Sequence, residues 1–247
     1  MKITGNTVLI TGATSGIGLG LARRLKDEGN EVVIAGRRKD AIDEVSARFG
    51  FDGVVIDVSD AESIKNGVRT VIERHPELNV VVNNAGIMLP ENVLEPGWLP
   101  VAEESVATNL LGPIRIVAEV LPHLLGRAEA WIVNVSSGLA FVPLPLTPTY
   151  SATKSGIHAF SEAVRVQLAG TSVGIVEIAP PPVRTKLMNQ EEREEAMPLE
   201  GFLDEVMSIL RADPDGHEVL VDAVKPFRNA QAEGTYDTFL EALSQRR

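Results

Sequence analysis

Hydrophobic residues in this chain gather in short runs, and the runs alternate with longer segments of helical periodicity. The short runs are uninterrupted and rich in Val and Ile, which is typical of strands buried on both faces of a parallel sheet. The longer segments between them place apolar positions on one side, as amphipathic helices do. This strand–helix order predicts an α/β fold with a doubly wound, mainly parallel sheet and right-handed crossovers.

The expected strands are Val8–Thr11, Glu31–Ala35, Val54–Asp57, Val80–Asn83, Ala130–Val135 and Ser172–Ile178. The expected helices are Gly16–Glu28, Asp40–Phe49, Glu62–Arg74, Thr149–Leu168 and a long Pro100–Leu125, with a possible break near Gly112-Pro113. Farther on, Glu191–Glu195 and Phe202–Leu210 are helix-like, and Gly216–Arg247 is expected to hold a short strand and a helix at Tyr236–Leu243. No break in composition separates these segments, so we expect one domain over residues 1–247.

The composition of the chain argues against several classes of function. The chain has 247 residues, 44% of them hydrophobic, which is ample for a core, and a formal net charge of −11. That charge argues against binding nucleic acid or an anionic membrane surface. The chain contains no cysteine, which excludes disulfides and thiolate catalysis. We see no signal peptide and no stretch long enough to span a membrane, and we expect a cytoplasmic protein.

A glycine-rich turn joins the first expected strand to the first helix. It runs Thr11-Gly12-Ala13-Thr14-Ser15-Gly16-Ile17-Gly18. Gly12 can take a positive φ, Gly16 lets the backbone approach a pyrophosphate, and Gly18 allows close packing of helix on strand. The N–H groups of Thr14, Ser15 and Ile17 and the helix dipole would then face phosphate groups. An ordinary βα turn would also use such glycines, but the position at the first βα junction favours a dinucleotide site.

The end of the second strand discriminates between NAD and NADP. An acidic residue there would bind the ribose hydroxyls and repel a 2′-phosphate, whereas this chain has Gly36 followed by Arg37 and Arg38. Because a guanidinium offers phosphate a bidentate donor pair, we expect NADP as the cofactor, with Arg37 as the main contact. The alternative is that both arginines are simply solvated at a helix start.

Further cofactor contacts are expected after the third and fourth strands. Asp57, followed by Val58, could accept a hydrogen bond from the adenine amino group, or could instead cap the next helix. The small residues of Asn83-Asn84-Ala85-Gly86 would let the adenosine ribose lie against the backbone at Asn83, Ala85 and Gly86. A plain Asn/Gly turn is the competing explanation.

Candidate proton-transfer chemistry lies later in the chain. Tyr150 and Lys154 are four residues apart, and therefore share one helical face, and Ser137 lies thirteen residues before Tyr150. A nearby ammonium should lower the pKa of the phenol, so that Tyr150 can exchange a proton with a carbonyl or alcohol oxygen. Ser137 would hydrogen-bond the same oxygen, Lys154 would also reach the nicotinamide ribose, and Asn109 would hold a water that links Lys154 to solvent. Taken singly, each of these residues is more often structural; together, behind a dinucleotide turn, they favour catalysis.

These residues give the chain a resemblance to the classical short-chain dehydrogenases/reductases. The matching positions are Gly12, Gly16, Gly18, the Asn83–Gly86 segment, Asn109, Ser137, Tyr150 and Lys154, in the expected order over roughly the first 185 residues. Within that family, the segments around Ser137 and Pro180 are similar to DltE-like oxidoreductases. The resemblance implies one Rossmann-like domain, a three-layer sandwich with a mainly parallel, about seven-stranded sheet. It also implies hydride transfer, and a dimer or tetramer formed through the Pro100–Leu125 and Thr149–Leu168 helices.

One position departs from the family pattern. The family has Pro-Gly after the sixth strand, where this chain has Pro180-Pro181, and proline cannot take the positive φ that glycine permits. By resemblance, the backbone of Val183 would bind the nicotinamide carboxamide and Thr185 would also contact the cofactor. We therefore expect a stiffer or differently shaped loop at these two contacts.

Two apolar segments are expected to surround the substrate. Leu139–Leu146 lies between Ser137 and Tyr150 and should form one wall of the pocket, and residues 186–201 should form a lid. Because both segments are mainly apolar, they favour a hydrophobic carbonyl or alcohol over a charged sugar as the substrate. They could equally pack against each other or against a second subunit. The four histidines lack ligand spacing, so we expect no catalytic metal.

The leading hypothesis is an NADP-dependent carbonyl reductase or alcohol dehydrogenase acting on CH-OH groups. One alternative is a non-catalytic NADP-binding sensor or scaffold, which would have no need of the Tyr150–Lys154 pair. Another is an epimerase or dehydratase, although the three-residue gap between Gly12 and Gly16 favours the reductase form.

Overall fold

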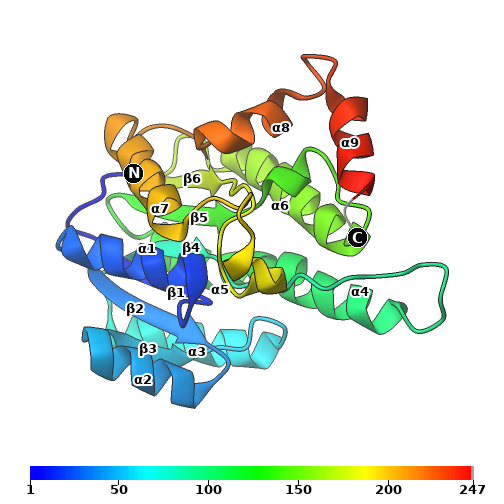
Figure 1. Ribbon diagram of the computed structural model, residues 1–247. Coiled ribbons are helices and arrows are strands. Elements are labelled where there is room, and N and C mark those ends of the chain that lie inside the picture. The colour runs from blue at the N-terminus through cyan, green and yellow to red at the C-terminus, as the bar shows by residue number, and fades with distance from the viewer. Residues whose placement is uncertain (246–247) are drawn as a thin grey trace.

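The computed structural model describes residues 1–245 and contains one seven-stranded, all-parallel sheet (Figure 1). The strand order is β3-β2-β1-β4-β5-β6-β7. The strands are β1 (Thr7–Thr11), β2 (Glu31–Gly36), β3 (Asp52–Val55), β4 (Leu78–Asn83), β5 (Ala130–Val135), β6 (Val173–Ile178) and β7 (Glu218–Val219). The predicted doubly wound parallel sheet is therefore confirmed.

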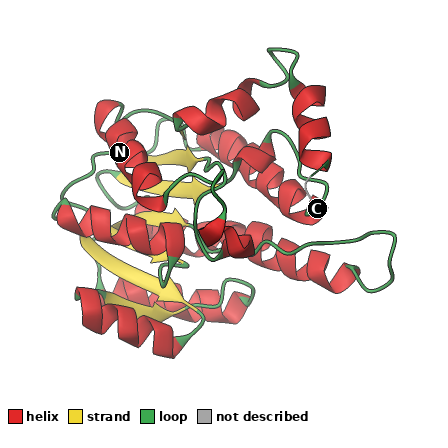
Figure 2. Ribbon diagram, in the orientation of Figure 1, coloured by secondary structure: helices red, strands yellow, loops and turns green. Residues whose placement is uncertain are grey.

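Helices cover both faces of the sheet (Figure 2). They are α1 (Gly16–Asp27), α2 (Lys39–Phe49), α3 (Ala61–Arg74), α4 (Leu99–Val106), α5 (Gly112–Leu124), α6 (Pro148–Gln167), α7 (Leu199–Ala212), α8 (Lys225–Asn229) and α9 (Tyr236–Ser244). The core residues of α1, α2 and α7 pack on one face, and those of α3, α5 and α6 on the other. Along β1, Val8 and Ile10 belong to the first core and Leu9 to the second, because successive strand residues point to opposite faces.

The long helix expected at Pro100–Leu125 is present but not uniform. A π-helical turn, η1 (Ala107–Leu111), joins α4 to α5 and contains Asn109. Pro113 is the second residue of α5, directly after this turn, and the chain continues as a helix without a break. Such π turns inside α-helices occur frequently at functional sites.

The last third of the chain differs most from the sequence-based expectation. Glu191–Glu195 does not form an α-helix; its first two residues end a 3₁₀ segment, η3 (Leu187–Glu192). The last residues of the expected lid, 199–201, belong to α7, which packs on α1. The short helix α8 was not expected, and it lies beside α9 at the top of Figure 1. Among residues 1–245, no helix has the length and hydropathy of a membrane span.

Candidate active site

A cavity of about 920 Å³ opens at the carboxyl ends of the strands and runs from the glycine turn to Ser137 and Tyr150. This is where open α/β sheets hold their ligands. The predicted site residues that line it are Gly12, Thr14, Ser15, Gly16, Ile17, Gly18, Arg37, Arg38, Asp57, Val58, Ala85, Gly86, Ser137, Tyr150, Lys154, Val183 and Thr185. Asn83 and Asn109 do not line it.

The glycine turn has the geometry expected from its sequence. Gly12 and Gly16 have positive φ values of 66° and 55°. A Cβ on Gly18 would lie 2.5 Å from the Gly12 carbonyl oxygen, so only glycine allows α1 to start this close to the turn. The N-cap residue Ser15 makes no side-chain hydrogen bond to the first helical N–H groups, which leaves them available to an anion in the cavity.

Arg37 and Arg38 lie beside this turn. A Cβ on Gly36 would come within 3.3 Å of Thr14 Cγ2, so the end of β2 packs directly against the turn. Both arginines are exposed and line the cavity, whereas the neighbouring Lys39 pairs with Asp43. Two cations therefore stand next to the uncapped end of α1, which is an arrangement that fits a second phosphate.

Asp57 does not cap the following helix. Its Oδ1 accepts hydrogen bonds from Ser59 N at 3.0 Å and Ser59 Oγ at 2.7 Å. The cap of α3 is Asp60, whose carboxylate accepts from Glu62 N and Ser63 N. The helix-cap alternative for Asp57 is therefore wrong, and the Asp57 side chain remains at the cavity wall.

Asn83 was expected among the cofactor contacts, but its side chain is buried and donates to Asn134 Oδ1 at 2.9 Å. Because side chains alternate along β4, Asn83 and its successor face different environments. Asn84 lines the cavity and donates to the carbonyl oxygens of Thr11 and Gly12, at 2.9 and 3.2 Å. Asn84 thus fixes the glycine turn, a role that the sequence analysis did not assign.

The predicted catalytic groups converge at the other end of the cavity. Lys154 Nζ lies 5.6 Å from the centroid of the Tyr150 ring and donates to the Val135 carbonyl oxygen at 2.8 Å. Ser137 Oγ accepts a hydrogen bond from Leu139 N at 3.1 Å, so its own O–H remains available to a substrate oxygen. All three side chains are buried to at least nine-tenths and border the cavity.

Burial changes the expected acidity of this pair. It raises the pKa of Tyr150 to about 12, while the nearby Ser137 hydroxyl acts in the opposite direction. It also lowers the pKa of Lys154 to about 8, against the attraction of Glu177. For these residues by themselves the pKa of Tyr150 therefore moves upward rather than downward as expected, because burial outweighs the effect of the Ser137 hydroxyl. Tyr150 is fully protonated at neutral pH, as a proton donor must be.

Asn109 binds the backbone rather than facing the cavity. Its Oδ1 accepts from Ile87 N at 2.9 Å and its Nδ2 donates to Ile87 O at 2.8 Å. This pair of bonds anchors the loop after β4, and Gly86 leaves room for the Asn109 side chain beside Lys154. The proposed water relay through Asn109 stays a prediction.

The proline-rich segment after β6 reaches the site without a glycine. Pro180 O accepts a hydrogen bond from Gly138 N at 2.8 Å, and Pro182 O accepts one from Met197 N at 2.9 Å. Val183 forms a parallel bridge with Met197, and Thr185 Cγ2 lies 3.4 Å from the Cβ position of Gly16. Pro181 therefore does not prevent Val183 and Thr185 from bordering the cavity.

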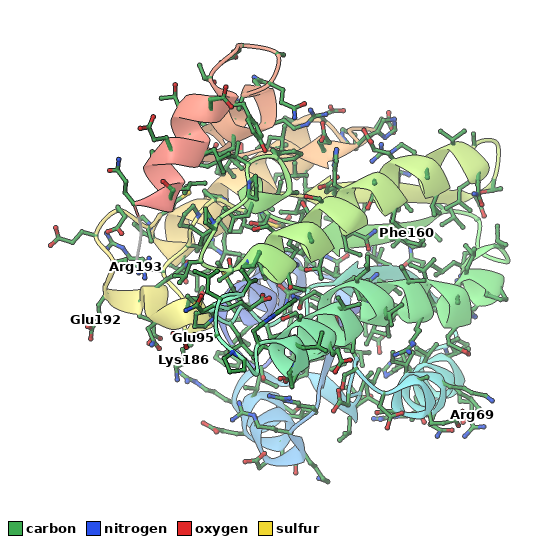
Figure 3. The ribbon with its side chains drawn as sticks, turned by 90° about the vertical axis from the view of Figure 1, so that its right-hand side faces the viewer. Arg69, Glu95, Phe160, Lys186, Glu192 and Arg193 are labelled. Atoms are coloured by element: carbon green, nitrogen blue, oxygen red, sulfur yellow. The ribbon has the colours of Figure 1, made fainter. Side chains whose placement is uncertain are left out.

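Other residues near the site were not identified from the sequence. Phe227 of α8 and Leu243 of α9 line the substrate end of the cavity, together with Leu144, Leu146 and Met188. The helical pattern at Tyr236–Leu243 was visible, but nothing in it indicated which pocket it would cover. In Figure 3 the labelled residues Lys186, Glu192 and Arg193, from the segment expected to form a lid, lie at one edge of the molecule, and Glu192 points outward.

The four histidines lack ligand spacing in the sequence, but the fold brings one of them close to two carboxylates. His158 lies with Glu177 and Glu218, and one potential ligand atom from each falls within 4.8 Å of the others. His158 Nδ1 is 2.8 Å from Glu177 Oε2, and Arg228 Nε donates to Glu218 Oε1 at 2.9 Å. The positive charge beside these two carboxylates is therefore supplied by protein side chains.

Comparison with known proteins agrees with this geometry. A family profile described as short chain dehydrogenase matches residues 6–196. The chain belongs to this family, and it is an oxidoreductase of the kind that uses a nicotinamide dinucleotide to act on a small molecule. It is 38% identical to the uncharacterized oxidoreductase DltE of Bacillus subtilis (strain 168) over 250 aligned positions, which cover 99% of this chain and 98% of that protein.

Solved structures show the same fold with bound cofactors. A short chain dehydrogenase from Burkholderia cenocepacia J2315 in complex with NADP superposes with a TM-score of 0.82 at 25% identity, covering 100% of both chains. A 3-ketoacyl-(acyl-carrier-protein) reductase from Brucella melitensis complexed with NADH gives a TM-score of 0.77 at 25% identity, covering 90% of this chain and 94% of that one. Relatives of this fold therefore bind either nicotinamide cofactor.

Proposed function

We propose that this protein is an NADP-dependent carbonyl reductase or alcohol dehydrogenase whose general acid/base is Tyr150. The observation that carries the proposal is the convergence of Ser137, Tyr150 and Lys154 on one end of a cavity whose other end is the glycine turn. Reduction of a carbonyl group requires a hydride at its carbon and a proton at its oxygen. The cavity has room for a hydride-carrying cofactor at the glycine turn and for a carbonyl compound beside Tyr150.

The residues present fit a dinucleotide at the glycine turn. The uncapped N–H groups of α1 would hold the pyrophosphate, and Asp57 would face the adenine. Arg37 and Arg38 would bind a 2′-phosphate, which favours NADP over NAD. Val183 and Thr185 would contact the nicotinamide end. When bound, the cofactor supplies the hydride for reduction or accepts it in the reverse reaction.

The side chains around the carbonyl then perform the proton transfer. Ser137 uses its free O–H to hydrogen-bond the substrate oxygen, while Tyr150 donates its phenolic proton to the same oxygen as negative charge develops there. The resulting phenolate is stabilised by the Lys154 ammonium, 5.6 Å from the ring centroid. In alcohol oxidation each proton moves in the opposite direction. One hydride and one proton together convert the carbonyl to the alcohol.

The substrate end of the cavity favours an apolar compound. Its apolar walls come from Leu139, Leu144 and Leu146, from Leu187 and Met188 of the expected lid, and from Phe227 and Leu243 of α8 and α9. Charged residues of the same lid segment, Lys186, Arg193, Glu194 and Glu195, also line the cavity. The apolar side chains stabilise a bound hydrocarbon group through burial and offer no partner to a charged one. We propose a hydrophobic aldehyde, ketone or secondary alcohol as the substrate class.

The test compares Tyr150→Phe with Tyr236→Phe, which removes the only other phenolic hydroxyl in the chain, in α9. Initial rates with NADPH and NADH are measured on a panel of hydrophobic aldehydes and ketones. Loss of the proton donor should lower kcat by roughly 10²–10⁴-fold in Tyr150→Phe, with unchanged NADPH affinity, and leave Tyr236→Phe near wild type. Wild-type turnover by Tyr150→Phe would contradict the proposal. Tight NADPH binding without turnover of any panel member would favour a nucleotide-binding sensor.

A further inference from the structure

A buried acidic residue lies behind the catalytic lysine. Glu177 occupies β6, within the otherwise apolar sequence Val173–Ile178, and is 1% exposed. Its Oε2 is 2.8 Å from His158 Nδ1, whereas its Oε1 is buried with no hydrogen-bond partner among the described residues. Burying a carboxylate with one free oxygen is unfavourable, so the position calls for an explanation beyond packing.

The fold places this carboxylate next to the Lys154 site. Lys154 Nζ bonds the carbonyl of Val135, and Val135 pairs in the sheet with Ile178, the residue after Glu177. His158, which holds Glu177, is one helical turn after Lys154 on α6 and therefore shares its face. Lys154 and the Glu177–His158 pair thus occupy neighbouring positions between α6 and strands β5 and β6.

The other charged groups around Glu177 are largely paired with one another. On β7, Glu218 lies opposite Glu177 and bonds Arg228 of α8. On α6, Glu162 Oε2 is 3.7 Å from His158 Nε2, and its side chain is 55% exposed. The edge of the His158 ring packs against Phe141 at a centroid distance of 5.1 Å, which restrains the imidazole. Because Arg228 already neutralises Glu218, these groups favour an internal charge network over a metal site.

We propose that Glu177 is a positioning residue for the reaction: its carboxylate, held by His158, keeps Lys154 in the ammonium form that stabilises the Tyr150 phenolate. This inference rests on the proton-transfer role proposed above for Lys154. Attraction to Glu177 raises the pKa of Lys154 against the effect of burial, and hydrogen bonding to Glu177 raises the pKa of His158. Without the carboxylate, burial would leave a larger fraction of Lys154 neutral near pH 8.

The test measures the Lys154 pKa directly in the intact protein. Lysine labelled with ¹³C at Cε is incorporated, the Lys154 signal is assigned by its loss in Lys154→Arg, and its shift is followed with pH. Glu177→Gln retains the shape of the side chain and removes the charge, and should lower the Lys154 pKa by about one unit or more. Glu162→Gln removes the same charge from the exposed neighbour of His158 and should leave the pKa unchanged within about 0.3 unit, because solvent screens it.

The sign of the shift separates electrostatics from structural damage. A variant that merely loosens the packing admits water to Lys154 and moves its pKa upward, toward the ordinary value near 10.4. An unchanged or raised pKa in Glu177→Gln would overturn the inference. His158→Gln, which keeps a donor for Glu177 and leaves the carboxylate charged, should not lower the pKa; a drop equal to that of Glu177→Gln would also overturn it.

Activity gives a second readout. The basic limb of the kcat–pH profile should move to lower pH in Glu177→Gln by the amount that the lysine signal shifts. Loss of activity in Lys154→Arg and Tyr150→Phe, together with an unmoved profile in Glu177→Gln, would overturn this inference and leave the proposed function standing. Full activity in Tyr150→Phe would overturn the proposed function, whereas the effect of Glu177 on the Lys154 pKa would still be measurable.

Discussion

At the scale of single residues, Arg37 gives the sharpest test of cofactor choice. It is exposed at the cavity wall next to the glycine turn. A charge-assisted bond to a 2′-phosphate contributes about 1.5–3 kcal/mol, so Arg37→Ala should weaken NADPH binding roughly 10–100-fold and leave NADH binding unchanged. Lys39→Ala removes the same charge two residues later, from a side chain that pairs with Asp43 outside the cavity.

Fluorescence titration of both cofactors into wild type and the two variants provides the comparison. Lys39→Ala should bind both cofactors as wild type does. An equal loss of NADPH and NADH affinity in Arg37→Ala would assign Arg37 a general structural role and remove the main support for NADP.

At the scale of elements, the N-terminus of α6 is held by a residue from a distant loop. Glu91 follows β4 and is 8% exposed; its Oε1 accepts from Thr149 N at 3.1 Å and its Oε2 from Thr149 Oγ1 at 2.6 Å. A carboxylate at this end of a helix satisfies a free N–H group and favours the dipole. The next residue is Tyr150, so Glu91 holds the helical turn that carries the proposed proton donor.

Glu91→Gln should therefore affect stability and catalysis together. It removes the charge and one of the two acceptor oxygens. We expect the free energy of unfolding, measured by urea titration, to fall by about 1–2 kcal/mol. Displacement of Tyr150 should lower kcat several-fold with little change in KM for NADPH. Glu95→Gln makes the same substitution at an exposed position of the same loop. It serves as the control and should match wild type in both measurements. If both variants behave alike, Glu91 does not position α6.

At the scale of the whole molecule, the buried Lys154 should reduce the stability of the fold. Its folded pKa of about 8 lies below the ordinary value, so below pH 8 the ammonium is retained in the core at a cost in free energy. The unfolded chain binds more protons between about pH 8 and 10.4, so this cost shrinks as pH rises through that window. Lys154→Met removes this cost but also loses the hydrogen bond to the Val135 carbonyl oxygen. The net effect should be a rise in the free energy of unfolding at pH 7 of on the order of 1–2 kcal/mol.

The gain in the free energy of unfolding of Lys154→Met should decline above pH 8 and disappear near pH 10.4. Reductase activity should be lost at every pH. Urea unfolding of wild type and Lys154→Met at several pH values between 6 and 10 tests this, with the exposed Lys65→Met as the control. A gain that does not depend on pH would mean that better apolar packing, rather than removal of a buried charge, is responsible.

The sequence by itself determined the parallel sheet, the turn at Gly12–Gly18 and the order of Ser137, Tyr150 and Lys154. These features depend on local periodicity, on backbone conformations that only glycine adopts readily, and on spacing within one helix. Only the tertiary structure decided that Asn83 turns into the core while Asn84 supports the glycine turn. It also decided that α8 and α9 border one end of the cavity and that Glu91 and Glu177 contact residues of α6. These contacts join residues far apart in the chain, and burial sets the acidity of Tyr150 and Lys154, so neither follows from a local pattern.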